Sequence, residues 1–282
     1  MLEPSKQQQA ELKEIQGSIA LVQFVTIKDQ EPFEFYRGTS ESAVLEAGGV
    51  RTHCVHIDQF LAGGEMPYQT ITVDQFSASE AAQRAFDAIS IERQAALVDI
   101  YALIVRPNDG LQRISKILGF LRPLLSRLLG TNAEKDIFGF ADVGNPETGP
   151  LPETVAEMRQ HDQTTPFYMM NLNKYYARAK YDNGEDVSGE QAYNRYGKWI
   201  APYLVSVGGY PDIMGQVLAI FVGDETSPLN DNWNEFAMVY YPSRKNFINM
   251  MTNSPQKGIH HRTAGLQRAV LMPSSDLWAR KR

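Results

Sequence analysis

The residues best suited to chemistry lie near the C-terminus, in the phrase His260-His261-Arg262. This phrase follows Pro255 in a predicted helical turn, so the two imidazoles point about 100° apart and only one can enter a given cavity. Because histidine titrates near neutral pH, we predict that His261 is a proton acceptor. The alternative is that the two histidines cap the helix or lie on the surface.

Two arginines and one asparagine are candidates for binding a ligand. Arg244 and Arg262 bracket one predicted helix, and a guanidinium that reaches a cavity suits a carboxylate or enolate through paired hydrogen bonds. Asn171 interrupts an otherwise apolar strand, so its amide needs a partner or a ligand. The alternatives are solvated arginines and a structural hydrogen bond from Asn171 to a neighbouring loop.

Aromatic residues recur at helical spacing in the second half of the chain, and Trp233 precedes a later strand. Such a stripe usually packs in a core. In the fold predicted below, the cavity lies between sheet and helices, so core aromatics can also bind a flat apolar ligand. We therefore count Tyr196 and Trp233 among the predicted ligand-binding residues. The stripe consists of Tyr193, Tyr196, Trp199 and Tyr203.

Several kinds of chemistry are disfavoured by the sequence. It contains no nucleophile elbow, phosphate-binding loop, dinucleotide fingerprint or His-Glu-x-x-His zinc motif. Adjacent histidines cannot converge on one ion without other segments, and no cysteine or carboxylate accompanies them at ligand spacing. We therefore predict no metal and no cofactor.

Length and composition indicate a globular protein with room for two domains. The chain has 282 residues, more than a usual single domain. Its net charge of −6 argues against nucleic acid as the main partner, since phosphate binding needs clustered Lys and Arg. The single cysteine, Cys54, suits a reducing compartment. We find no signal-peptide pattern and no transmembrane segment, and predict a cytoplasmic location.

An internal repeat divides the chain. Short phrases that begin with paired glycines recur at a constant offset of 160 residues, and two later strands match at offsets of 166 and 167. Each copy has the predicted order strand, helix, strand, strand, helix, strand. The recurring positions are Gly48 and Gly208, Gly63 and Gly223, and Glu65 and Glu225.

This order builds a four-stranded antiparallel sheet with both helices on one face, and the bare face needs a cover. The second sheet can supply it. We therefore predict an α+β fold in which two ferredoxin-like βαββαβ modules form an α/β barrel within one chain. The predicted boundaries are 18–107 for the first module, 108–164 for a helical insert and linker, and 165–274 for the second module.

Local signals set the predicted ends of the elements. Gly48 follows the first helix as a residue that permits a left-handed cap. Ser77 and Glu80 form a predicted capping box for the next helix. In the second module we predict strands over 167–172 and 236–241, and a helix from Ser243 that is interrupted near Pro255.

Residues 110–130 of the insert are predicted to form a basic amphipathic helix. Its apolar residues recur every three or four positions, with no acidic residue between Asp109 and Glu134. We expect the apolar stripe to pack on its own domain; the alternative is a partner or a membrane surface. The stripe consists of Leu111, Ile114, Leu118, Leu121, Leu125 and Leu128.

The second module resembles a known family in five phrases. They are Phe167-Tyr-Met-Met-Asn-Leu-Asn-Lys-Tyr175, Tyr181-Asp-Asn-Gly, Ser188-Gly-Glu-Gln-Ala-Tyr-Asn-Arg-Tyr196, Tyr241-Pro-Ser-Arg-Lys-Asn-Phe247 and Ile259-His-His-Arg-Thr-Ala-Gly265. They resemble the dimeric α/β-barrel superfamily and, within it, the group called domain of unknown function 1330. The resemblance covers residues 166–273, whereas 18–106 match the fold pattern alone. Its members include cofactor-free monooxygenases, haem-handling enzymes, lactone isomerases and ligand binders, so it implies a fold and no single reaction.

Two hypotheses for function follow. In the first, the chain binds a small apolar or aromatic acid in the cavity of the second module and can transform it without a cofactor. His261 then accepts a proton, Arg262 or Arg244 pairs with the anion, and Asn171 orients the ligand. In the second, the chain is a non-catalytic binding protein, and the helix over 110–130 contacts a partner or makes peripheral contact with a membrane.

Overall fold

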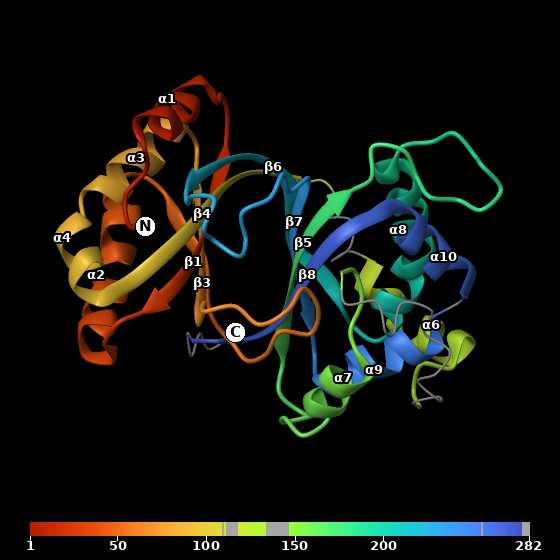
Figure 1. The fold of residues 1–282 in the computed structure, drawn as a ribbon. Coiled ribbons are helices and arrows are strands. Elements are labelled where there is room, and N and C mark those ends of the chain that lie inside the picture. The colour runs from red at the N-terminus through yellow and green to blue at the C-terminus, as the bar shows by residue number, and fades with distance from the viewer. Residues whose placement is uncertain (109, 111–117, 134–146, 255, 278–282) are drawn as a thin grey trace.

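An eight-stranded antiparallel sheet, closed into a barrel, forms the centre of the molecule. The computed structural model describes residues 1–108, 110, 118–133, 147–254 and 256–277 (Figure 1). Around the barrel the strands follow the order β1-β3-β2-β8-β5-β7-β6-β4. The α+β barrel predicted from the sequence is therefore confirmed.

The same order of strands and helices occurs in each half of the chain. The first half, called module 1, follows an N-terminal helix α1 (Lys6–Glu14) that the sequence analysis did not predict. Module 1 consists of β1 (Ile19–Ile27), α2 (Gln30–Glu46), β2 (Val50–Ile57), β3 (Thr70–Phe76), α3 (Ser79–Asp87), α4 (Ser90–Ala96) and β4 (Leu97–Pro107). Module 2 consists of β5 (Phe167–Tyr175), α8 (Gly189–Ser206), β6 (Tyr210–Val222), β7 (Glu235–Tyr241), α9 (Arg244–Asn253), α10 (Gln256–Gly265) and β8 (Leu266–Asp276).

Two strand pairs close the barrel between the modules. Strand β4 pairs along β6, and β2 pairs with the end of β8 through His56 opposite Ser275. Strands β4 and β6 approach so closely that a Cβ on Gly215 would lie 2.1 Å from the carbonyl oxygen of Arg106. A side chain at position 215 would therefore break this pairing. The modules thus share one continuous sheet.

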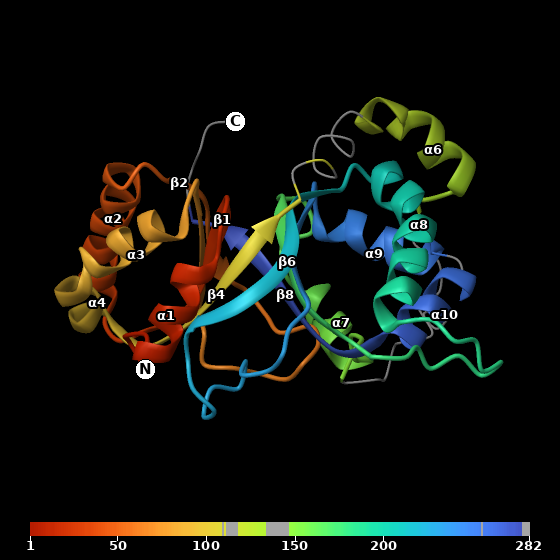
Figure 2. The same ribbon diagram turned by 90° about the horizontal axis from the view of Figure 1, so that it is seen from above.

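Helices cover the barrel on two opposite sides. Helices α2, α3 and α4 pack on module 1, and α8, α9 and α10 pack on module 2 (Figures 1 and 2). The barrel interior holds aromatic residues from both modules, such as Phe24, Tyr101, Tyr168 and Phe236. Each bare sheet face is therefore covered by the other, as predicted.

The space between sheet and helices is filled in module 1. Phe33, Tyr36 and Phe86 pack there with aliphatic residues of the strands. Arg93, which is fully buried, stacks 3.5 Å from the ring centroid of Phe86 and donates a 2.7 Å hydrogen bond to its carbonyl oxygen. Buried side chains thus occupy the space between the sheet and the helices of module 1.

Several element ends lie where the sequence predicted them. Gly48 and Gly208 both have φ of +80° and follow α2 and α8, which is the left-handed cap that glycine permits. Ser188 and Gln191 form a capping box at the start of α8. The last helical segment divides into α9 and α10 on either side of residue 255.

The predicted capping box of Ser77 and Glu80 is wrong. The N-cap of α3 lies one residue later, at Ala78, and makes no side-chain capping bond. The Ser79 hydroxyl instead donates a 3.0 Å hydrogen bond to the carbonyl oxygen of Ile15, which joins α3 to the segment after α1. A tertiary contact therefore occupies the hydroxyl of the first residue of this helix.

The insert contains η1 (Leu118–Leu121), α6 (Arg122–Leu129) and α7 (Pro152–Met158). Residues 111–117 of the predicted helix lie outside the described residues. Helix α6, which has Pro123 in its first turn, packs against α8 and buries none of its residues completely. Leu121 and Leu125 are partly covered, whereas Leu128 is exposed. Among the described helices, none is both long and apolar enough to cross a membrane.

Candidate functional site

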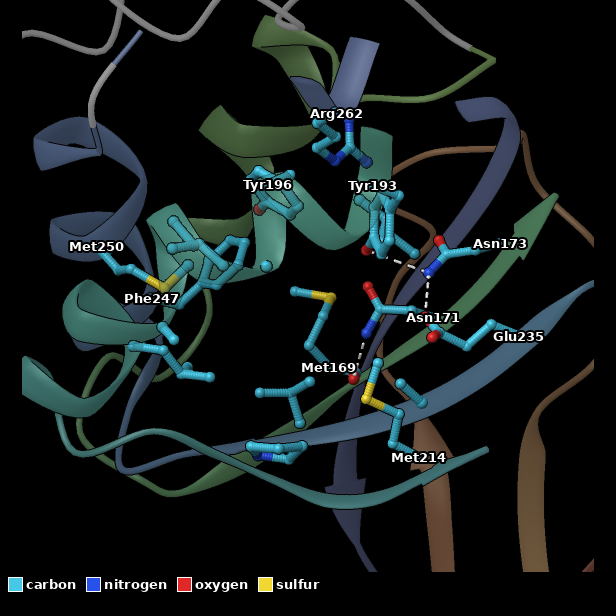
Figure 3. A pocket seen from close by; sticks show the side chains of 18 of the residues that line it. Met169, Asn171, Asn173, Tyr193, Tyr196, Met214, Glu235, Phe247, Met250 and Arg262 are labelled. Carbon is cyan, nitrogen blue, oxygen red and sulfur yellow. Dashed lines mark hydrogen bonds between the residues drawn. The ribbon is translucent and has the colours of Figure 1, made fainter. Parts of the chain in front are cut away.

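A cavity of about 620 Å³ lies in module 2, between the outer face of the sheet and helices α8, α9 and α10 (Figure 3). It occupies the position that is filled by packing in module 1. The sheet therefore forms its floor and the helices form its walls.

Alternation along the strands determines which side chains reach the cavity. On β5, Met169, Asn171 and Asn173 line it, while Met170 and Leu172 between them point into the barrel. On β7 every second residue lines the cavity in the same way. Strands β5 and β7 pair, and Asn173 of β5 lies opposite Glu235 of β7. The β7 lining residues are Glu235, Ala237, Val239 and Tyr241.

One face of α8 forms a wall of the cavity. The lining residues recur at three- and four-residue spacing, which places them on one side of a helix. Gly197 lies among them, and a Cβ at this position would meet no other atom within 4 Å. The α8 lining residues include Tyr193, Tyr196, Gly197, Ile200, Ala201 and Leu204.

The cavity has an apolar end and a polar end (Figure 3). Phe247 and Met250 of α9 lie at the apolar end. Tyr193, Asn173 and Glu235 gather at the other. A molecule with a flat apolar body and a polar group at one end matches this distribution.

Hydrogen bonds connect the groups at the polar end. The side-chain amide of Asn173 donates to the Tyr193 hydroxyl at 3.1 Å and to a Glu235 carboxylate oxygen at 3.0 Å. Tyr175 also hydrogen-bonds Glu235 through its side chain. Asn173 is 1% exposed, so packing holds its amide in this orientation. The positions of Tyr193 and Glu235 are fixed through this shared amide.

The carboxyl group of Glu235 has a pKa near neutral pH. Burial raises the pKa of Glu235 to about 7, because the charged carboxylate loses solvation. Hydrogen bonds from Asn173 and Tyr175 lower this pKa in part, and the charge of Glu190 raises it. Burial and the nearby Glu235 also raise the pKa of Tyr193, which keeps its phenol neutral. Near neutral pH the site therefore contains both forms of a carboxyl group beside a neutral hydroxyl.

Arg262 brings a positive charge to the same cavity. It is 5% exposed and donates a hydrogen bond to the carbonyl oxygen of Thr148. Its charge acts on Tyr193, where it lowers the phenol pKa against the larger effect of burial. The guanidinium is thus held by the linker that precedes α7, with its charge next to the polar end.

Three of the residues predicted from the sequence lie on the cavity: Asn171, Tyr196 and Arg262. Asn171 donates a 2.9 Å hydrogen bond to the carbonyl oxygen of Met169 in its own strand, as Figure 3 shows. Its amide therefore has a structural partner, in its own strand and not in a neighbouring loop, while the side chain lines the cavity.

The other three predicted residues do not line the cavity. Trp233 is buried in the barrel interior, where its indole donates a 2.7 Å hydrogen bond to the carbonyl oxygen of Leu229. Arg244 is buried against module 1, where it pairs with Asp58. The contacts of these two residues are therefore those of structural side chains.

His261 lies on the side of α10 that packs against the segment before α8. Its Nδ1 is 2.6 Å from the Tyr181 hydroxyl. Burial lowers the pKa of His261, and the charges of Arg195 and His260 lower it further. This arrangement favours a neutral imidazole that is hydrogen-bonded outside the cavity.

The sequence analysis did not select Asn173 and Glu235. Asn173 shares a face of β5 with Asn171, because residues two apart on a strand point the same way, but the predicted strand ended at residue 172. Glu235 was missed because the predicted strand began at Phe236, which left Glu235 in the preceding loop. Both predicted strands therefore stopped one residue short of the pair that Asn173 and Glu235 form.

Comparisons with known proteins give limited information. No protein-family model matches the chain, and no curated protein matches it significantly. A solved structure of a protein of unknown function from Rhodopseudomonas palustris is 26% identical, with a TM-score of 0.41, and the match covers 45% of this chain and 94% of that protein. Chlorite dismutase from Candidatus Nitrospira defluvii is 11% identical, with a TM-score of 0.40 over 95% of each chain. At these TM-scores neither match supports a conclusion about function.

Within the described part of the chain, no three His, Cys, Asp or Glu side chains gather in a way that could hold a metal ion.

Proposed function

We propose that this protein binds a small, flat, mainly apolar molecule in the cavity of module 2, and that the molecule carries an acidic group. The observation that carries the proposal is the division of the cavity into an apolar end and a polar end that contains Arg262. Its volume of about 620 Å³ is in the range of small-molecule sites. Tyr196 and Asn171 contact the ligand in this proposal, whereas His261, Trp233 and Arg244 do not.

The proposal for an acid rests on charge. A buried guanidinium favours an anion through charge-assisted hydrogen bonds. Glu235 does not oppose this, because a carboxyl group with a pKa near 7 takes up a proton when a second negative charge approaches. We therefore expect the affinity for an aromatic carboxylate to fall as the pH rises above 7.

A filled cavity tests the binding site directly. Replacement Gly197→Leu places a branched side chain in open space on the cavity wall. Leucine also favours a helix over glycine by about 0.8 kcal/mol, so the fold is retained. The matched control is Gly38→Leu on α2, where a Cβ also meets no atom within 4 Å and which does not line the module 2 cavity.

The readout is saturation-transfer NMR with phenylacetate and phenylacetamide. We expect both proteins to fold, and binding of phenylacetate to be lost in G197L alone. In R262Q we expect the preference for phenylacetate over phenylacetamide to fall by about tenfold, as for the loss of one charged hydrogen bond. Equal binding by G197L and G38L would reject this cavity as the site.

The family and location predictions belong to the same proposal. We propose that module 2 belongs with the group called domain of unknown function 1330, that the two modules are a tandem repeat, and that the protein works in the cytoplasm. The recurrence of the element order and the matching caps at Gly48 and Gly208 support the repeat.

A second candidate function is contact with an anionic membrane surface through α6. Leu124 and Leu128 are 57% and 69% exposed and lie four residues apart on one face of α6. Phe120, in the preceding η1, is 73% exposed. Arg122 and Arg127 are exposed in the same helix, which contains no acidic residue. Apolar and basic residues on one surface helix are typical of interfacial binding.

Co-sedimentation with phosphatidylserine vesicles tests this candidate. We expect binding that weakens with salt and that is lost when Leu124 and Leu128 are both replaced by Glu. Equal binding to phosphatidylcholine vesicles, or no effect of the double replacement, would reject it.

A further inference from the structure

Glu235 is a buried carboxylate whose surroundings leave it open to the cavity. It accepts hydrogen bonds from Asn173 and Tyr175, and among the described residues no Lys or Arg forms an ion pair with it. A carboxylate that is desolvated and not neutralised is costly for the fold. Such groups occur preferentially where a protein uses them.

Tyr193 supplies a hydrogen-bond donor at the same end of the cavity. Its hydroxyl oxygen accepts from Asn173, so its own hydrogen is directed elsewhere, and no described protein group accepts it. Because the phenol stays neutral, it can donate to an oxygen on a bound molecule without losing its proton.

The geometry points to a role for these groups in proton transfer: we infer that Glu235 is a catalytic base, and that it removes a proton from a carbon next to a carbonyl group of the bound molecule while Tyr193 donates to the carbonyl oxygen. This inference rests on the proposed binding function of the cavity. The substrate class is an enolisable carbonyl compound with an aromatic or conjugated body.

The distance between the two groups fits this fragment. Both oxygens lie about 3 Å from the same Asn173 nitrogen, so they are at most about 6 Å apart. The two N–H bonds of an amide diverge, which keeps the oxygens separate. An H–C–C=O unit can then place its hydrogen at one oxygen and its carbonyl at the other, within hydrogen-bond reach of both.

The step balances without an oxidant or cofactor. The carbon–hydrogen bond breaks and its proton moves to a Glu235 oxygen. The electron pair forms a carbon–carbon double bond, and the carbonyl π electrons move to the oxygen, where Tyr193 stabilises the developing charge. Glu235 then returns the proton to the same carbon or to a conjugated one, and the net reaction is exchange or isomerisation.

The near-neutral pKa of Glu235 supports this role, since a proton-transfer group works best when both of its forms are accessible. The groups that face it from the packed elements are Asn173 and Tyr175 of β5, and Tyr193 and Glu190 of α8. Arg262 of α10 faces the neighbouring Tyr193, whose pKa its charge lowers.

Hydrogen–deuterium exchange into a probe tests the inference. Phenylpyruvate and phenylacetone both carry enolisable protons beside an aromatic ring, and only the first is an acid. The full chain is incubated with each in D₂O, and loss of the benzylic proton signal is followed by NMR after subtraction of the buffer rate. Binding of the same probes is measured in parallel by saturation transfer.

With the neutral probe phenylacetone we expect catalysed exchange whose rate rises with pH toward a plateau above 7, because no second negative charge then holds the proton on Glu235. In E235Q it falls at least 100-fold while probe binding changes little. In Y193F it falls by about 100-fold. E235D keeps the carboxylate one methylene further back and retains part of the activity, and E225Q, at an exposed carboxylate, matches the wild type.

The outcomes separate the two proposals. Bound probe without exchange, or exchange that persists in a folded E235Q, overturns the proton-transfer inference and leaves the binding function intact. Failure of every aromatic probe to bind overturns the binding function, and the inference falls with it.

Discussion

The buried carboxylate of Glu235 makes a prediction about stability that needs no ligand. Glutamine has almost the same shape but cannot ionise, so E235Q removes the titration and leaves the packing. The comparison of interest is the difference in free energy of unfolding between E235Q and the wild type as the pH changes.

The magnitude follows from the two pKa values of the carboxyl group. The pKa of the Glu235 carboxyl group is about 7 in the folded protein, against 4.5 for the unperturbed group. Between these values the folded protein holds a proton that the unfolded chain has released, so the free energy of unfolding falls as the pH rises. Each pKa unit corresponds to 1.36 kcal/mol, so the wild type loses about 3 kcal/mol relative to E235Q from about pH 4.5 to above pH 7.

Urea unfolding followed by circular dichroism across this pH range measures the effect. Any constant offset from the amide of glutamine cancels, because only the pH dependence of the difference is used. E225Q is the control, since Glu225 is exposed, and its difference from the wild type should stay nearly flat. A flat difference for E235Q would show that the carboxylate is solvated, and would refute the reasoning on burial.

Three further predictions concern buried side chains outside the cavity. R244M leaves the largely covered Asp58 without its cation, so we expect a loss of about 3 kcal/mol in urea unfolding, with part of it recovered when Asp58 is also replaced by leucine. In module 1, Asp74 and Arg51 form an ion pair at 2.7 Å, and both side chains are almost fully buried. For Asp74→Ala we expect a loss of about 3–5 kcal/mol in urea unfolding, with ligand binding in module 2 unchanged in the folded fraction. Burial raises the pKa of the Cys54 thiol to about 11, so iodoacetamide should label the native protein at least 100-fold more slowly than the urea-unfolded chain at pH 8, and equal rates would contradict its burial.

The sequence was sufficient for the fold because local signals agreed with one another. Gly48 and Gly208 marked the same turn in both modules. Pro255 marked the division of the last helical segment. Each of these signals acts within a few residues, so tertiary contacts were not needed to interpret them.

The candidate site was predicted only in part, because the orientation of a side chain depends on contacts between distant residues. Helical spacing separated His260 from His261 but could not indicate which of them, if either, would face a cavity. Arg244 faces Asp58, a residue 186 positions away, and no local pattern contains that pairing. Asn171 was found because a polar residue in an apolar strand is a local signal.

The joining of both modules in one chain has a consequence for how such a protein can change. In a symmetric homodimer every substitution appears twice, so a filled sheet–helix space and an open one cannot coexist. In this chain Arg93 and Phe86 can seal one module while Gly197 and Ala237 leave room in the other. Substitutions in module 1 can therefore increase the stability of the fold, while substitutions in module 2 change ligand selectivity. The two modules vary independently, because a substitution in one does not appear in the other.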